Sequence, residues 1–276
     1  MSLKNALRHR LVRLSLSLAV LPATLSAPLA HAHEAWLLPS STVLSSTGYV
    51  TIDGAVSNDL FFFNYRPMMV RDNLVISAPD GSTVQPENLL QGQLRTVFDA
   101  NLQAAGTYRI ALVNASLMAS WKENGETKRW RGSHEDLAAS VPANAEELVI
   151  REGNSRIETF ITVGRPSELK PSGRGLELLP VTHPNDLYAG DPATLAFVID
   201  GKPAANIEVE IMAGGTRYRD QLEKQKLVTD AQGRITHTWP APGMYYLKTT
   251  VDGQSDTMQN TERRLSYVAT LEVLAQ

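Results

Sequence analysis

The 276-residue sequence predicts an all-β protein with two β-sandwich domains behind a cleavable signal peptide. Apolar and polar residues alternate along residues 207–211 and again along 245–251. This period of two is typical of strands with one buried face. Turn signals such as Asp80-Gly81 and Asp200-Gly201 recur roughly every 8–12 residues, the spacing of antiparallel sandwiches.

The first 32 residues have the three parts of a secretory signal peptide. Four basic residues and no acidic one precede an apolar stretch at 14–25, and Ala30-His31-Ala32 supplies the small-x-small cleavage pattern. The apolar stretch is too short for a bilayer, which needs about 20 residues. Because Pro28 disfavours a cut after Ala30, we expect His33 to be the first residue of a mature protein that works outside the cytoplasm.

The composition of the mature chain excludes several classes of function. Removing the four basic residues of the leader changes the formal net charge from −3 to −7, which argues against nucleic acid and anionic lipid as partners. We expect no transmembrane segment in the mature chain, because no other apolar stretch approaches 18 residues. The absence of cysteine removes disulfides, thiolate metal sites and cysteine nucleophiles.

The domain boundary is predicted from composition. Residues 165–175 are rich in proline, glycine and charge, as expected of a linker, and separate an N-terminal domain at 33–164 from a C-terminal domain at 176–276. Two segments look alike across this boundary. Gly106-Thr107-Tyr108 and Gly243-Met244-Tyr245 each place a tyrosine two residues after a glycine turn, which supports two sandwiches of related design.

An insert in the first domain interrupts the strand pattern. We expect residues 121–131, which are polar and include Trp121 and Trp130, to form a long inserted loop. Either the loop is functional, or its two tryptophans pin it to the sandwich. A helix is expected around 134–148, with Ser133 as its cap and Pro142 as an interruption.

Catalytic signatures are weak, and we expect a protein that is not an enzyme. Ser167 and Lys170 match the S-x-x-K pattern of serine acyl-enzymes but lie in the predicted linker. His134-Glu135 begins like a zincin helix, but Ala138 stands where the second zinc ligand belongs.

The candidate metal ligands are histidines. As the first mature residue, His33 can chelate a divalent ion through its α-amino nitrogen and Nδ1, a ligand set that suits copper and nickel. Glu34 or a further imidazole would complete the site; otherwise His33 is an ordinary exposed terminus. His183, in the turn-rich stretch 182–192, is a second candidate or a residue packed at a domain junction. His237 suits a strand, and Met68-Met69 suit soft copper or core filling.

Several blocks of the sequence resemble a widespread bacterial family. They are His-Glu-Ala-Trp-Leu-Leu-Pro-Ser at 33–40, Gly-Leu-Glu-Leu-Leu-Pro at 175–180, Thr-His-Pro-Asn-Asp at 182–186, Ala-Gly-Asp at 189–191 and Gly-Thr-Arg-Tyr at 215–218. The family is a domain of unknown function that is also labelled a nickel-uptake substrate-specific region or a periplasmic component of cobalt/nickel transport. A looser resemblance links the His-initiated start to small periplasmic copper-resistance proteins.

The resemblance implies a periplasmic, metal-linked binding protein whose second domain is immunoglobulin-like or carboxypeptidase-regulatory-like. We therefore expect a nickel- or cobalt-binding protein with His33, Glu34 and His183 as metal ligands and a metal-uptake transporter or outer-membrane receptor as partner. Two alternatives remain. One is a metal-free structural module that docks on an outer-membrane receptor or a polysaccharide, and the other is a copper-handling periplasmic protein.

Overall fold

The protein is all-β, as predicted. The computed structural model describes residues 33–219 and 223–276, so the predicted signal peptide at 1–32 lies outside the described residues. Helical structure within them is limited to α1 (His134–Ser140) and the 3₁₀ turn η1 (Thr216–Tyr218). Neither element is long and apolar enough to cross a membrane.

The N-terminal half is a sandwich of two sheets. One is a five-stranded sheet in the order β1-β3-β8-β7, with β4 paired to β3. Its strands are β1 (Glu34–Pro39), β3 (Gly48–Ser57), β4 (Arg66–Pro67), β7 (Glu87–Gln91) and β8 (Thr96–Leu102). It faces part of a ten-stranded sheet, and Ile52 and Phe98 pack there against Ile110 and Ile161 in one buried core.

The ten-stranded sheet supplies strands to both halves of the molecule. It runs in the order β16-β15-β18-β19-β11-β9-β5-β6, with β10 paired to β9 and β2 to β11. Its strands in the first half are β2 (Val43–Leu44), β5 (Leu74–Ser77), β6 (Thr83–Val84), β9 (Gly106–Glu123), β10 (Glu126–Gly132) and β11 (Glu146–Val163). Those in the second half are β15 (Glu208–Ala213), β16 (Gln225–Val228), β18 (Gly243–Gln254) and β19 (Thr261–Val273).

The C-terminal half is an immunoglobulin-like sandwich. Its second sheet contains β12 (Leu176–Pro180), β13 (Pro192–Ile199), β14 (Lys202–Pro203) and β17 (Arg234–Thr238). Phe197 and Trp239 pack between this sheet and Leu247 and Tyr267 of the ten-stranded sheet. Antiparallel pairing within each sheet and one core between them are the features of this architecture.

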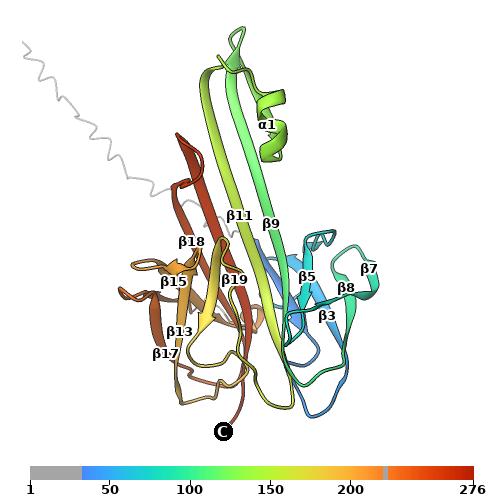
Figure 1. The fold of residues 1–276 in the computed structure, drawn as a ribbon. Helices are drawn as coiled ribbons and strands as arrows, with labels where there is room; N and C mark the ends of the chain where they lie inside the picture. The colour runs from blue at the N-terminus through green and yellow to red at the C-terminus, as the bar shows by residue number, and fades with distance from the viewer. Residues whose placement is uncertain (1–32, 220–222) are drawn as a thin grey trace, which may run out of the picture. The chain divides into compact units, whose positions relative to one another are not determined.

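A parallel strand pair joins the two halves. Strand β11 of the first half pairs with β19 of the second, from Ile150 opposite Thr261 to Thr159 opposite Thr270 (Figure 1). Phe160 of β11 also belongs to the core of the second half. The predicted linker is irregular and lies between β11 and β12. The division into domains at 33–164 and 176–276 stays a prediction.

The two similar glycine–tyrosine segments have the same structure. The hydroxyl of Tyr108 contacts the backbone of Ala104, and the hydroxyl of Tyr245 donates to the carbonyl of Ala241, each four residues upstream. This back-bonded tyrosine is the tyrosine corner of immunoglobulin-like sandwiches. The local similarity seen in the sequence therefore marks the same corner in each half.

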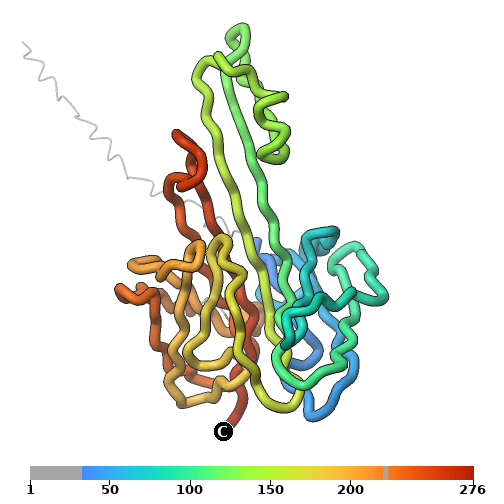
Figure 2. The backbone as a smooth tube through the Cα atoms, in the orientation of Figure 1, coloured from blue at the N-terminus to red at the C-terminus, as the bar shows by residue number. Residues whose placement is uncertain are grey.

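The prediction of a long loop at 121–131 is wrong, because these residues continue a β-hairpin. Strands β9 and β10 pair up to Glu123 and Glu126, and the turn between them is Asn124-Gly125, with φ of 51° and 79°. Positive φ at both turn residues is the type I′ geometry that Asn-Gly favours. Strands β9 and β11 extend together past the sandwiches (Figure 2). We call residues 116–153 the arm.

The predicted helix is present but short. It begins at His134, where Ser133 accepts a hydrogen bond from the backbone of Asp136, and ends at Ser140. Residues 146–148, expected to be helical, open β11 instead. Trp121 packs with Val141 and Trp130 in a small cluster on the arm, so the two tryptophans anchor the helix rather than pin a loop to the sandwich.

Candidate functional site around His33

His33 lies exposed at the start of the described chain, directly before β1. Its imidazole stacks on the ring of Tyr65, with the ring centroids 3.7 Å apart and the planes inclined by 18°. The guanidinium carbon of Arg66 lies 5.9 Å from the centre of the same tyrosine ring. The stacking on Tyr65 therefore positions the imidazole at the surface.

Tyr65 ends an aromatic loop, residues 61–65, between β3 and β4. Phe61 packs edge-on against Trp36, with the centroids 5.6 Å apart, and has a φ of +61°. The Arg217 guanidinium lies 4.0 Å from the centre of the Phe62 ring. A positive φ at a bulky residue persists only where the surrounding packing imposes it, and both halves contribute to that packing here.

Two of the sequence blocks behind the family resemblance meet at this loop. The backbone N–H of Leu60 donates to the Thr216 hydroxyl across 2.9 Å in a buried contact. A Cβ added to Gly214 would lie 2.9 Å from the Phe61 ring. The 215–218 block therefore supports the loop that carries Tyr65, and Trp36 of the 33–40 block packs against Phe61 and Phe63 of that loop.

Glu34 does not share a site with His33. Its carboxylate accepts a hydrogen bond of 2.8 Å from the Tyr246 hydroxyl and contacts the Lys248 ammonium at 3.0 Å. Burial, followed by the charge of Glu34, raises the pKa of Tyr246 well above its usual value, so the phenol remains a donor. Through its contacts with Tyr246 and Lys248 of β18, Glu34 ties β1 to the second half.

His183 lies in a different hydrogen-bond network, at the junction of the two halves. The backbone N–H of Asn185 donates to its Nδ1, at 3.1 Å. Nε2 must therefore carry the proton, and it donates to the Thr107 hydroxyl at 3.0 Å. Burial lowers the pKa of His183 below 6.5, which keeps the ring neutral.

The network continues through two threonines and Asn185. The Thr162 hydroxyl donates to the side-chain oxygen of Asn185 at 2.9 Å. Thr107 therefore donates to Thr162 across 2.9 Å, and the Asn185 amide donates to the carbonyl of Phe160 at 3.0 Å. Both nitrogens of His183 are occupied by this chain of bonds, which joins the 182–186 block to β9 and β11.

The structure does not assemble the three predicted metal ligands. Within residues 33–219 and 223–276 there is no group of three histidine, aspartate or glutamate side chains placed to hold a metal ion. The other soft or imidazole candidates have packing roles. Met68 belongs to the N-terminal core whereas Met69 is exposed, and His237 is buried edge-on against Trp239.

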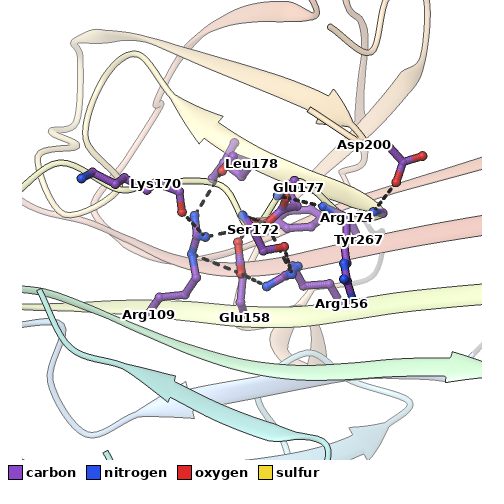
Figure 3. Close-up of polar contacts among 12 residues, drawn as sticks. Arg109, Arg156, Glu158, Lys170, Ser172, Arg174, Glu177, Leu178, Asp200 and Tyr267 are labelled. Atoms are coloured by element: carbon purple, nitrogen blue, oxygen red, sulfur yellow. Dashed lines mark hydrogen bonds and ion pairs between the residues drawn. The ribbon is translucent and has the colours of Figure 1, made fainter. Parts of the chain in front are cut away.

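A buried ion cluster fastens the linker to the central sheet. Arg109 and Arg156 lie between Glu158 and Glu177, with nitrogen–oxygen distances of 3.3–3.8 Å (Figure 3). The backbone amides of Ser172 and Gly173 donate to Glu177, and Arg109 donates to the carbonyl of Lys170. Sequence patterns did not indicate this cluster, because Arg109, the Arg156–Glu158 pair and Glu177 come from three separate parts of the chain. It fixes a segment that composition alone predicts to be flexible.

Two surface cavities have the size of small-molecule sites. One, of about 590 Å³, lies between the β5–β6 turn, β9 and the linker, with Arg109 and Arg156 in its wall. The other, of about 610 Å³, lies at the base of the arm and is lined by small and charged side chains, among them Ser116, Gly153 and Arg264. In the first cavity the positive charges of Arg109 and Arg156 are paired with the carboxylates of Glu158 and Glu177. These two arginines therefore do not offer an unpaired positive charge to a ligand.

Two solved structures show distant similarity to the chain. The chain is similar to the D0-D1 domain of intimin, with 11% identity and a TM-score of 0.22, covering 86% of this chain and 97% of that one. It is also similar to the Yersinia pseudotuberculosis adhesin InvE, with 11% identity and a TM-score of 0.22, covering 85% and 58% of the two chains. TM-scores this low carry no argument about function.

A sequence model of a protein family matches most of the chain. No curated protein matches the chain. The model described as "Domain of unknown function (DUF4198)" matches residues 30–253, a span that includes His33, the 182–186 block and the 215–218 block. The chain therefore belongs to the DUF4198 family.

Proposed function

We propose that the mature protein binds a divalent transition-metal ion, nickel or cobalt first, at its N-terminal residue in the periplasm. It would pass the ion to an uptake system, either a transporter or an outer-membrane receptor. The nickel-uptake and cobalt-transport labels of the family it resembles support this proposal.

The observation that carries the proposal is the position of His33. Its ring is exposed yet held against Tyr65, and within the described residues neither ring nitrogen has a hydrogen-bond partner. Cleavage after Ala32 would add a free α-amino group on the same residue. Amine and imidazole nitrogens together form a chelate suited to nickel and copper, so a copper-handling role uses the same site.

The proposal now rests on His33 alone. Glu34 is held by Tyr246 and Lys248, and both nitrogens of His183 are engaged by the protein. A single residue supplies two donors, so the other coordination positions of the metal stay open to donors from outside the chain.

Native mass spectrometry of protein isolated from its own periplasm tests this function. We expect a chain that begins at His33 and carries one divalent transition-metal ion, with the metal lost after acidification because protons compete for both nitrogens. A chain that stays metal-free after exposure to nickel, cobalt and copper would contradict the proposal.

A second candidate function is docking on a macromolecular partner through the arm. The arm belongs to neither sandwich core, yet it is ordered by its own cluster around Trp121 and Val141. Ser116 and Gly153 are opposite each other in the β9–β11 register, so a two-residue turn can join them and delete the arm. If docking is the function, this deletion should abolish partner binding and leave nickel binding unchanged.

A further inference from the structure

The first cavity, of about 590 Å³, lies over a strand pair and beside the linker, and we call it the linker groove. Val75 of β5 is opposite Ala111 of β9, and both side chains line the groove together with Val113 and Ala115. Alternate residues of a strand point to one face at intervals of about 6.5 Å. The floor is therefore apolar and repeats every two residues, as the side chains of an extended peptide do.

The linker groove is closed at one end. A Cβ added to Gly106 would lie 2.6 Å from Pro79 and 3.0 Å from the Ser167 hydroxyl oxygen, so the β5–β6 turn and the linker meet there. The ion cluster holds the linker wall in place, because its Arg109 donates to the carbonyl of Lys170. A groove that is formed before its ligand arrives avoids the entropy cost of ordering its walls on binding.

The exposed charges change sign along the linker groove. Asp80 and Glu168 each follow a residue of the contact that closes it, so two carboxylates flank the closed end. Hydrogen bonds from Ser82 lower the pKa of Asp80, which keeps this carboxylate ionised. Lys170 and Arg174 come later along the linker wall, and the Lys170 side chain points away from the ion cluster (Figure 3). None of these four charged groups has an ion-pair partner within residues 33–219 and 223–276.

Three hydroxyl groups complete the lining, those of Ser77, Ser155 and Ser266. They can exchange hydrogen bonds with the backbone of a ligand that lies along the floor. A ligand with a single charged end would leave one set of charges in the groove without a partner. A peptide with free ends carries an amine at one end and a carboxylate at the other, so it matches both sets.

We propose that the linker groove binds a short, extended peptide with small apolar side chains. The amino end of the peptide pairs with Asp80 and Glu168, and its free carboxylate pairs with Arg174. Alternate side chains of the peptide pack on the apolar floor. Binding is non-covalent and does not involve His33, so its test is independent of the proposed metal site.

Two pools of synthetic pentapeptides serve as probes. Each peptide begins with lysine and continues with alanine and valine in every order, and the pools differ in having free or amidated carboxyl ends. The variants are Arg174→Gln, Ala115→Trp and the control Arg165→Gln, which removes the same charge from an exposed linker position outside the groove. Native mass spectrometry identifies the bound peptides, and calorimetry gives their affinities. Circular dichroism should be the same for all four proteins.

We expect the wild-type protein to bind one free-ended peptide per chain. Arg174→Gln should weaken that binding by about threefold to fivefold, the scale of an exposed ion pair, and leave the affinity for the amidated peptide unchanged. Ala115→Trp fills the groove at an exposed position and should abolish binding of both peptides, while Arg165→Gln should change neither affinity.

Three results would overturn the proposal. The first is a wild-type protein that binds no peptide of either pool. The second is an Arg174→Gln variant that weakens neither form of the peptide or weakens both equally. The third is undiminished binding in Ala115→Trp, which would place the peptide outside the linker groove.

Discussion

His183 Nε2 lies 3.0 Å from the hydroxyl oxygen of Thr107 and joins the loop that opens the second half to strand β9 of the first. The sequence left two interpretations of His183, a metal ligand and a residue packed at a domain junction. The observed bonds match the second, because both ring nitrogens are used by the protein itself.

Replacing His183 by alanine should reduce stability rather than metal affinity. The variant leaves the backbone N–H of Asn185 without its acceptor in a buried position, which costs about 1–3 kcal/mol of unfolding free energy. Urea denaturation measures the loss, and His134→Ala, on the exposed start of α1, serves as the control with little change. A His183→Ala protein of normal stability and impaired nickel binding would restore His183 as a ligand.

Mild acid should destabilise the protein. Burial lowers the pKa of both His183 and His237 below 6.5, so the unfolded chain binds more protons than the folded one once the pH falls under 6.5. Stability should therefore be constant above pH 7 and decline from pH 6.5 to 5.5, a range above the ordinary pKa of carboxylates. The free energy of unfolding, measured by urea denaturation at each pH, should decline less steeply in His183→Ala than in the wild-type protein. Equal declines in the two proteins would show that His183 does not contribute to the pH dependence.

The ion cluster should be sensitive to the loss of one member. Glu158 is fully buried, contacts Arg109 and Arg156, and accepts a hydrogen bond of 2.5 Å from Tyr267. Glu158→Ala leaves two buried guanidinium groups short of a partner and should cost about 3–5 kcal/mol. Glu262→Ala, which breaks the exposed pair with Arg151, is the matched control and should cost less than about 1 kcal/mol. Similar losses of unfolding free energy in the two variants would mean that the buried ion cluster contributes no more to stability than an exposed ion pair does.

The arm should unfold locally when its small cluster is disrupted. Trp121→Ala removes a buried tryptophan side chain from the cluster that includes Val141 beside α1. Hydrogen exchange should then accelerate across 134–140 while the two sandwich cores keep their protection. Leu148→Ala, at an exposed position of the arm, is the control. Unchanged protection of α1 in Trp121→Ala would show that the helix is held by other contacts.

Local patterns predicted the strands and several turns correctly. The alternation at 207–211 corresponds to β15, in which Val209 and Ile211 face the core. Asp200 and Gly201 have φ of 50° and 78° and form a two-residue turn between β13 and β14. The arm hairpin carried an equally strong signal in Asn124-Gly125, but the polar composition around it favoured a loop.

Local sequence patterns could not predict which distant strands pair with each other. Nothing near Ile150 or Thr261 in the sequence indicates that β11 and β19 run parallel. The same limit applies to the site, since Tyr65 lies 32 positions from His33 in the chain and reaches it through the loop after β3. His33 could be proposed as a metal ligand from the sequence, because the adjacent signal-peptide pattern predicts that it is the first residue of the mature chain.

Metal affinity as a function of the N-terminus tests the central claim most directly. Calorimetry would compare nickel(II) binding by a chain that begins at His33 with a chain that carries one extra glycine before it. The added residue turns the chelating amine into an amide and moves the new amine away, so affinity should fall by well over tenfold, more than about 1.4 kcal/mol, with an unchanged circular dichroism spectrum. Equal affinity in the two proteins would contradict an N-terminal metal site and favour the arm-mediated docking function.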